Sequence, residues 1–214
     1  MIFQSTESIE KIASGHDQNY FELIGTVGDL RQFAGGLHVD MRVPYDNGKV
    51  QAPCTPTITF YGDDAIQAIK KAIDPSKHPK VCIVGTIHTR RSDKNGETRY
   101  YQDLVGESIA FVNGYVQTNE LRLVGEITNI HYPAQENGSP PCVMMTIRTI
   151  LGERMYFPKI IGFERLVRVA HQFKEGDRIA VYGSVFTKSR YEETGWKFYQ
   201  SIVVTGFGSP EIAA

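Results

Sequence analysis

The chain has 214 residues, of which 41% are hydrophobic and 22% charged, a balance typical of folded proteins and too apolar for general disorder. Its 23 Lys and Arg residues stand against 24 Asp and Glu residues, so the net charge is −1. This charge excludes a polycation of the histone type but permits a local basic stripe that binds nucleic acid. No apolar run approaches the roughly 18 residues that a membrane helix needs, and residues 1–14 do not resemble a secretory signal.

The chemistry-bearing residue types are scattered along the chain. Cys54, Cys82 and Cys142 lie far apart, which predicts neither a disulfide framework nor a zinc site and favours a reducing, cytoplasmic location. The six histidines have no metal-ligand spacing, and no phosphate loop, dinucleotide motif or nucleophile elbow is present. We therefore expect no enzyme, no metal, no cofactor and no small-molecule substrate.

The chain repeats itself. Phe21-Glu-Leu-Ile-Gly-Thr-Val is similar to Leu121-Arg-Leu-Val-Gly-Glu-Ile at a shift of 100 residues, and the same shift places Gly62 on Gly162. Later the shift becomes 98 residues, because the linker after the first predicted helix is longer than its counterpart. An ordered series of matches with a length change in a loop indicates two copies of one fold.

Each copy shows the same order of predicted elements. Alternating apolar and polar residues predict strands, and a one-sided apolar stripe predicts one helix. In the first copy we expect strands at 21–30, 37–43, 57–61, 81–89 and 99–108, and a helix at 63–73 with Asp63 as its N-cap. In the second copy we expect strands at 121–130, 142–150, 154–161, 179–188 and 197–205, and a helix at 163–173.

Five strands with one helix between the third and the fourth is the order of an OB-fold, a Greek-key barrel. The predicted fold class is therefore mainly β, with two tandem OB-folds at residues 20–113 and 119–207. A generic repeat of β-sandwiches is the alternative. Residues 1–19 form an N-terminal arm of unassigned role, and residues 208–214 form a short tail.

The hairpins carry a family resemblance. Lys174-Glu-Gly-Asp-Arg-Ile-Ala-Val-Tyr-Gly-Ser-Val-Phe-Thr-Lys-Ser-Arg-Tyr, followed by Gly195-Trp-Lys-Phe-Tyr-Gln-Ser-Ile-Val-Val, resembles the last hairpin of bacterial single-stranded-DNA-binding (SSB) proteins. Lys80-Val-Cys-Ile-Val-Gly-Thr-Ile-His-Thr-Arg-Arg-Ser fits the same pattern, and Phe60-Tyr-Gly resembles the family's third strand. The resemblance implies single-stranded DNA as the partner. Family chains with two OB domains dimerise, so it also implies a homodimer. The family's acidic tail has no counterpart in 208–214, where one acid stands, so we do not expect a tail that recruits partners.

Binding a single strand without reading its sequence needs cations that follow the phosphates and flat rings on which bases stack. Both hairpin tips supply cations beside rings. The first-copy candidates are Tyr61, Arg90, Arg91, Lys94, Arg99 and Tyr101. The second-copy candidates are Arg148, Tyr156 and Lys159 on the middle strands and Lys188, Arg190, Tyr191, Trp196 and Lys197 on the hairpin. The competing reading is that the tip charges only provide solubility and that the rings pack across the hairpins.

The predicted function is sequence-independent binding and protection of single-stranded DNA in replication, recombination or transfer. An RNA- or primosome-type OB module would use the same kind of surface, and the residues do not separate the two. A structural OB protein that only forms oligomer contacts is the third reading, supported by the near-neutral charge.

Overall fold

The computed structural model describes residues 1–4, 17–46, 51–94, 97–114, 116–135, 138–192 and 195–208. Most of the predicted N-terminal arm (5–16) and the end of the tail (209–214) lie outside the described residues. So do Asn95 and Gly96. Within the described part of the chain, no helix is both long and apolar enough to cross a membrane.

Strands dominate both halves of the chain. The first half contains β1 (Phe3–Gln4), β2 (Gln18–Phe33), β3 (Gly36–Asp46), β4 (Gln51–Cys54), β5 (Thr57–Tyr61), α2 (Asp63–Ala72), the 3-10 helix η1 (Pro75–Lys77), β6 (Lys80–Lys94) and β7 (Glu97–Phe111). The second half contains β8 (Thr118–His131), β9 (Cys142–Leu151), β10 (Arg154–Tyr156), β11 (Lys159–Phe163), α3 (Arg165–Ala170), β12 (Arg178–Glu192) and β13 (Gly195–Gly208).

Five strands in each half pair in a closed ring. The first barrel runs β2–β3–β5–β7–β6 and returns to β2, and only its β5–β7 pair is parallel. The second barrel runs β8–β9–β11–β13–β12 and returns to β8, again with one parallel pair, β11–β13. This strand order, with a helix between the third and fourth strands, is that of an OB-fold and confirms the predicted fold class. The domain limits 20–113 and 119–207 stay a prediction.

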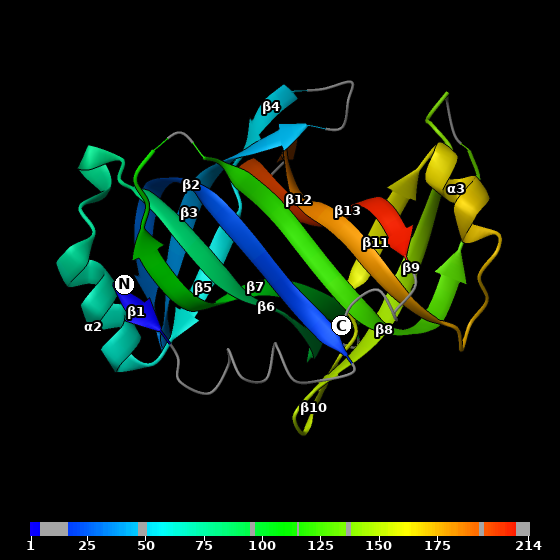
Figure 1. Ribbon diagram of the computed structural model, residues 1–214, viewed down its shortest axis with the longest axis horizontal. Helices are drawn as coiled ribbons and strands as arrows, with labels where there is room; N and C mark the ends of the chain where they lie inside the picture. Colours follow the sequence, from blue (N-terminus) through cyan, green and yellow to red (C-terminus); the bar gives the residue numbers. More distant parts are fainter. Residues whose placement is uncertain are drawn as a thin grey trace.

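The apolar residues that alternate along each strand face the inside of the barrel, and the residues between them face outward. In β9, for example, Val143, Met145 and Ile147 are buried, and the residues between them are not. The helices close the barrels at opposite ends of the molecule (Figure 1). The apolar stripe of α2 buries Ile66 and Ile69 completely or nearly so.

The two barrels are joined by an antiparallel pairing of β2 with β8, which run side by side through the centre of the molecule (Figure 1). Phe21 faces Leu121 in this pair, and these two residues are equivalent in the repeat. An antiparallel pair centred on equivalent positions relates the two barrels by an approximate twofold axis, as in an isologous dimer. Each surface of the first barrel therefore has a counterpart across that axis.

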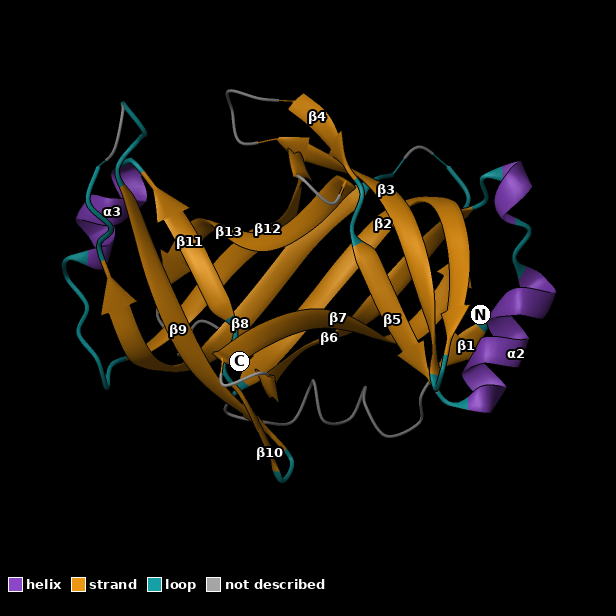
Figure 2. Cartoon of the chain, turned by 180° about the vertical axis from the view of Figure 1, so that it is seen from behind, coloured by secondary structure: helices purple, strands orange, loops and turns teal. Residues whose placement is uncertain are grey.

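The expected strand at 154–161 is wrong. It is broken at Phe157-Pro158 into β10 and β11. Pro158 has no N–H to donate, and the Phe157 N–H bonds the Thr89 hydroxyl of the first barrel at 2.8 Å instead of a strand. β10 leaves the barrel as an arm paired only with the end of β9, and Figure 2 shows it projecting on the side opposite β4. The helix expected at 163–173 is also shorter, because Phe163 belongs to β11 and pairs with Cys142.

The alignment of Gly62 with Gly162 is wrong as well. Ile58 of β5 and Ile160 of β11 hold equivalent places between their neighbouring strands, which is a shift of 102 residues. Tyr61 is therefore the counterpart of Phe163 and not of Ile161.

The same shift makes Glu164 the counterpart of Gly62. Gly62 is the N-cap of α2 with φ 90°, and Glu164 is the N-cap of α3 with φ 52°. Asp63, expected as N-cap, is instead a first-turn residue of α2, where its charge favours the positive end of the helix dipole.

Candidate nucleic-acid interface

The two long hairpins, β6–β7 and β12–β13, each reach across to the other barrel. On the first hairpin, the Thr89 hydroxyl accepts from the Phe157 N–H at 2.8 Å and the Gln102 side-chain oxygen accepts from the Lys159 N–H at 2.7 Å. The Gln102 amide also donates to the Lys159 carbonyl at 3.3 Å. These bonds fix the first hairpin on the third strand of the second barrel.

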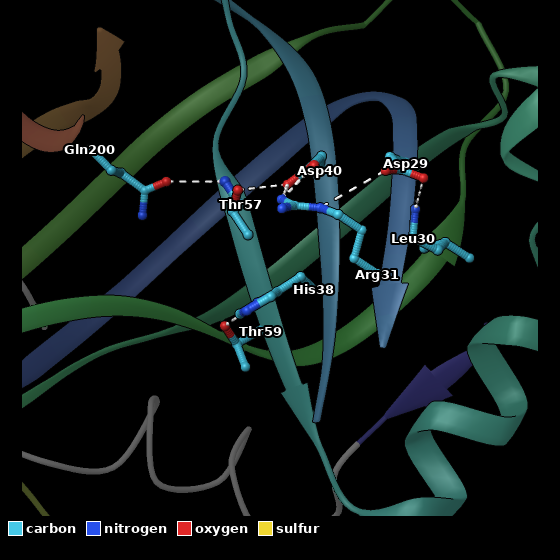
Figure 3. Close-up of polar contacts among 8 residues, drawn as sticks. All are labelled: Asp29, Leu30, Arg31, His38, Asp40, Thr57, Thr59 and Gln200. Atoms are coloured by element: carbon cyan, nitrogen blue, oxygen red, sulfur yellow. Dashed lines mark hydrogen bonds and ion pairs between the residues drawn. The ribbon is translucent and has the colours of Figure 1, made fainter. Parts of the chain in front are cut away.

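The second hairpin makes the same contacts in the opposite direction. The Thr187 hydroxyl accepts from the Thr55 N–H at 2.8 Å, and the Gln200 side-chain oxygen accepts from the Thr57 N–H at 3.1 Å. Figure 3 shows Gln200 pointing at Thr57 beside the strands of the first barrel. The exchange brings β5, β7, β11 and β13 together around the approximate twofold axis.

A groove lies between these four strands. Its central part has a volume of about 610 Å³ and is lined by residues of both barrels. A second part of about 480 Å³ shares Tyr100, Tyr101, Gln102 and Lys159 with the first and continues along the first hairpin to Arg90 and Arg91. We call both parts together the interbarrel groove. Because neither barrel lines it alone, it exists only where the two barrels are joined.

Exposed rings with cations against their faces line the interbarrel groove. Tyr100 is 63% exposed, and the Lys159 ammonium lies 5.0 Å from the centre of its ring. Tyr101 is 38% exposed, and the Arg90 guanidinium carbon lies 4.6 Å from its ring centre. Cations at this distance are attracted to the negative face of an aromatic ring. The groove therefore holds aromatic rings and positive charges side by side, as binding of a base and its phosphate by one site requires.

Carboxylates balance the cations of the first hairpin. Arg90 Nε lies 2.9 Å from Asp103 Oδ2, and this hydrogen bond raises the pKa of Arg90 above its ordinary value. Arg91 Nε lies 3.1 Å from Asp93. These exposed pairs leave the first hairpin with little net charge.

The second hairpin places related residues across the axis. The strand register makes Tyr199 the counterpart of Tyr101 and Lys188 the counterpart of Arg90. Tyr199 is 46% exposed and lines the central part of the groove, and Lys188 is exposed. Arg190 lies opposite Lys197 in the backbone ladder and Tyr191 opposite Trp196. The side chains of these four candidates, and those of Lys94 and Arg99, lie outside what the structure describes.

The lining of the groove does not include three further candidates, Tyr61, Arg148 and Tyr156. Tyr61 is 51% exposed at the end of β5, and its ring meets Phe33 edge-on at 6.4 Å. Arg148 is held by Glu126 at 2.5 Å on the outer face of β8 and β9.

Tyr156 packs between the barrels. It is only 8% exposed, and its ring stacks on His88 of the first hairpin at 4.6 Å, so little ring surface is left for a base. Across the axis, Tyr45 packs on Phe186, the counterpart of His88, at 4.7 Å. Burial, and to a smaller extent nearby Arg154, lower the pKa of His88 to about 4, so the imidazole is neutral in this contact at pH 7.

A polar network covers the outer face of β2, β3 and β5 (Figure 3). Asp40 accepts from Arg31 at 2.7 Å and from the Thr57 hydroxyl at 2.6 Å. The His38 ring bonds the Thr59 hydroxyl at 3.1 Å, and its pKa is lowered by burial first and by Arg31 second. The side chains on this face are therefore positioned by one another.

Sequence reasoning missed two rings, Tyr100 and Tyr199. Each lies beside a second aromatic residue in its strand, and within a barrel one of two consecutive side chains faces the core. Beyond the barrel, however, a hairpin has solvent on both faces, so both positions are accessible. The repeat contains a signal for Tyr199, because Tyr-Gln occurs at equivalent places in the two copies, 101–102 and 199–200.

No family model matches the chain, and no curated protein sequence matches it. The solved structure of the wild-type single-stranded DNA binding protein from Thermus aquaticus matches with a TM-score of 0.67 over 92% of this chain and 94% of that one, at 18% identity. A deletion mutant of the same Thermus aquaticus protein matches with a TM-score of 0.68 over 91% and 95%, also at 18% identity. The fold is that of this DNA-binding protein. The similarity spans both barrels and confirms the predicted resemblance at the level of fold.

Among the described residues, no group of three or more His, Cys, Asp or Glu side chains is close enough to hold a metal ion. Cys54, Cys82 and Cys142 are free thiols. Burial raises the pKa of Cys82 to about 11, with a smaller contribution from Glu22.

Proposed function

We propose that the protein binds single-stranded DNA in the interbarrel groove without reading its sequence and without catalysing a reaction. The single observation that carries the proposal is the pair of exposed rings, Tyr100 and Tyr101, each with a cation against one face at 5.0 and 4.6 Å. Every base offers a flat face, so stacking on such rings is independent of sequence. The similar solved structures, which are named single-stranded DNA binding proteins, support the same function.

The arrangement across the axis favours a strand that passes from one barrel to the other. Tyr101 and Tyr199 are equivalent rings, one on each hairpin, and both line the central part of the groove. Lys159 belongs to the second barrel, and its ammonium lies against the Tyr100 ring of the first hairpin. A strand bound to both hairpins would be covered over several nucleotides. Coverage of this kind would protect DNA during replication, recombination or transfer.

We also propose that the protein works as a homodimer in the cytoplasm. β4 and β10 stand at the two ends of the strand order and each has one neighbour among the described strands, so each offers a free edge. The three free thiols suit a reducing compartment. Sedimentation at micromolar concentration tests the dimer, and a strict monomer would refute it.

Titration of a fluorescein-labelled oligo-dT, followed by anisotropy, tests the binding function. Tyr100→Ala removes one exposed ring, and we expect a loss of about 1–3 kcal/mol, or about 5- to 150-fold in Kd. Tyr132→Ala is the matched control, since Tyr132 is also an exposed ring but stacks on His171 away from the groove.

Three results would contradict the proposal. They are no binding by the wild-type protein, equal losses in the two variants, and tighter binding of an oligo-U competitor than of oligo-dT. The last result would favour an RNA partner, and the first would favour a structural role.

A further inference from the structure

The two barrels carry different charges on equivalent faces. The strand registers make Asp40 of β3 the counterpart of Thr146 of β9, and Asp29 of β2 the counterpart of Asn129 of β8. The hairpin registers match Asp103 with Ser201 in the same way. The second barrel thus lacks all three of these carboxylates.

In the first barrel these carboxylates are paired with the cations of the same face. Arg31 lies 2.7 Å from Asp40 and 3.9 Å from Asp29, and Figure 3 shows its guanidinium between the two. Arg90 lies 2.9 Å from Asp103. Arg42 is a third cation on this outer face. The first barrel therefore has three cations there, against the three carboxylates Asp29, Asp40 and Asp103.

In the second barrel, Arg148 and Lys188 hold the places of Arg42 and Arg90, and Lys159 adds a cation at the place of Thr57. His131 stands at the place of Arg31. The carboxylates on this face are Glu126 and Glu175, and Glu175 accepts from the Asn129 amide at 3.5 Å. Glu126 is used by Arg148. Among the described residues, neither Lys188 nor Lys159 has a carboxylate within ion-pair distance, and both are exposed. Of the described cations Arg90, Arg91, Lys159 and Lys188, the two that have no carboxylate partner therefore belong to the second barrel, whereas Arg90 and Arg91 of the first barrel are both paired.

We infer that the second barrel makes most of the phosphate contacts to a bound single strand, while the carboxylates of the first barrel neutralise its cations and leave it mainly the stacking contacts. This inference rests on the proposed function and assigns different tasks to its two halves. The physical reason is that a cation already paired at 2.9 Å must give up its partner before it binds a phosphate, whereas Lys188 only gives up water.

The salt dependence of binding separates the two barrels. Each phosphate contact to a single strand contributes about 0.7 to the slope of log K against log salt. We expect Lys188→Gln to lower this slope by about 0.7. Arg90→Gln with Asp103→Ser, which removes a whole ion pair from the first barrel, should lower it by less than about half of that amount. Lys71→Gln, on the exposed end of α2, is the control for the change in net charge and should change the slope least.

Asp103→Ser alone gives the first barrel the residue found at the same place in the second. It releases Arg90, so we expect the slope to rise by up to about 0.7 and binding at low salt to tighten. Far-UV circular dichroism and the urea midpoint of each variant show whether it is folded.

Two results would overturn the inference. One is a slope loss in the Arg90→Gln, Asp103→Ser variant that equals or exceeds that of Lys188→Gln. The other is an unchanged or smaller slope in folded Asp103→Ser. Either result with normal wild-type binding leaves the proposed function standing, whereas absence of wild-type binding removes the proposed function itself.

Discussion

The join between the barrels depends on a buried asparagine in each copy. Asn19 of β2 is fully buried; its amide donates to the Ile87 carbonyl at 2.9 Å and to the Thr149 hydroxyl at 3.2 Å, and its oxygen accepts from the Ile87 N–H at 3.0 Å. The backbone pairing of β2 with β6 ends at Phe21, whereas its pairing with β8 on the other edge continues to Gln18. The Asn19 side chain therefore continues the ladder to β6 where the backbone no longer reaches it.

We expect Asn19→Ala to destabilise the protein by about 2–6 kcal/mol. The substitution leaves the N–H and the carbonyl of Ile87 buried without partners, and each such group costs about 1–3 kcal/mol. Asn119 bonds Val185 in the same way at 2.8 Å and also donates to the Pro44 carbonyl at 2.9 Å, so Asn119→Ala should cost a similar amount.

Urea unfolding followed by far-UV circular dichroism measures this loss. Asn129→Ala is the matched control, because Asn129 is an exposed asparagine of β8 whose substitution should stay within about 0.5 kcal/mol of wild type. A loss below about 1 kcal/mol for Asn19→Ala would refute the reasoning, since the Ile87 groups would then have found other partners.

Two further predictions concern stability at acid pH and the close backbone contact at Gly125. The folded-state pKa of His88 lies at about 4, below its ordinary 6.5, so between these values the unfolded chain takes up a proton that the folded chain does not, and stability falls as the pH falls. His88→Phe, which copies Phe186, should reduce the drop in urea midpoint between pH 7.5 and 5, and an unchanged drop would contradict this. Gly125→Ala places a Cβ 2.1 Å from the Arg148 carbonyl oxygen and should cost at least about 2 kcal/mol in urea unfolding, whereas Gly206→Ala, with open space, should cost less; equal losses would speak against the close approach.

Much of the fold could be predicted because it rests on local and repeated patterns. The period-two alternation of 142–150 marks the inner face of β9, and the apolar stripe of 63–73 marks the face of α2 that closes the barrel. Comparing the two copies adds the strand order, since both show one helix between the third and fourth strands. These signals depend on burial, which the type of each side chain reveals directly.

The errors fall where a distant partner decides the geometry. The break at Phe157-Pro158 follows from the missing N–H of Pro158 together with the bond of the Phe157 N–H to Thr89, 68 residues away. The register of β11 is set by its neighbours β9 and β13. Tyr156 looked like a ring on a binding face but packs on His88 of the other barrel. No local pattern announces a contact of this kind.

The candidate site could be predicted only in part. Arg90, Arg91, Tyr101 and Lys159 do line one groove, yet the sequence does not show that the groove is built from both barrels. That arrangement depends on hydrogen bonds such as Thr57 to Gln200, which lie 143 residues apart. The pairing of Asp103 with Arg90 was equally hidden, because the aspartate lies 13 residues from the arginine along the chain.

The most direct test of the central claim is photo-crosslinking of the wild-type protein to an oligo-dT that carries 5-bromo-deoxyuridine, with the crosslinked residues identified by mass spectrometry. A base that stacks on a ring lies within bonding distance of it, so the account predicts crosslinks at Tyr100, Tyr101 and Tyr199 in the interbarrel groove. Crosslinks at saturating oligonucleotide that avoid all three tyrosines and fall on surfaces such as Tyr132 would contradict it.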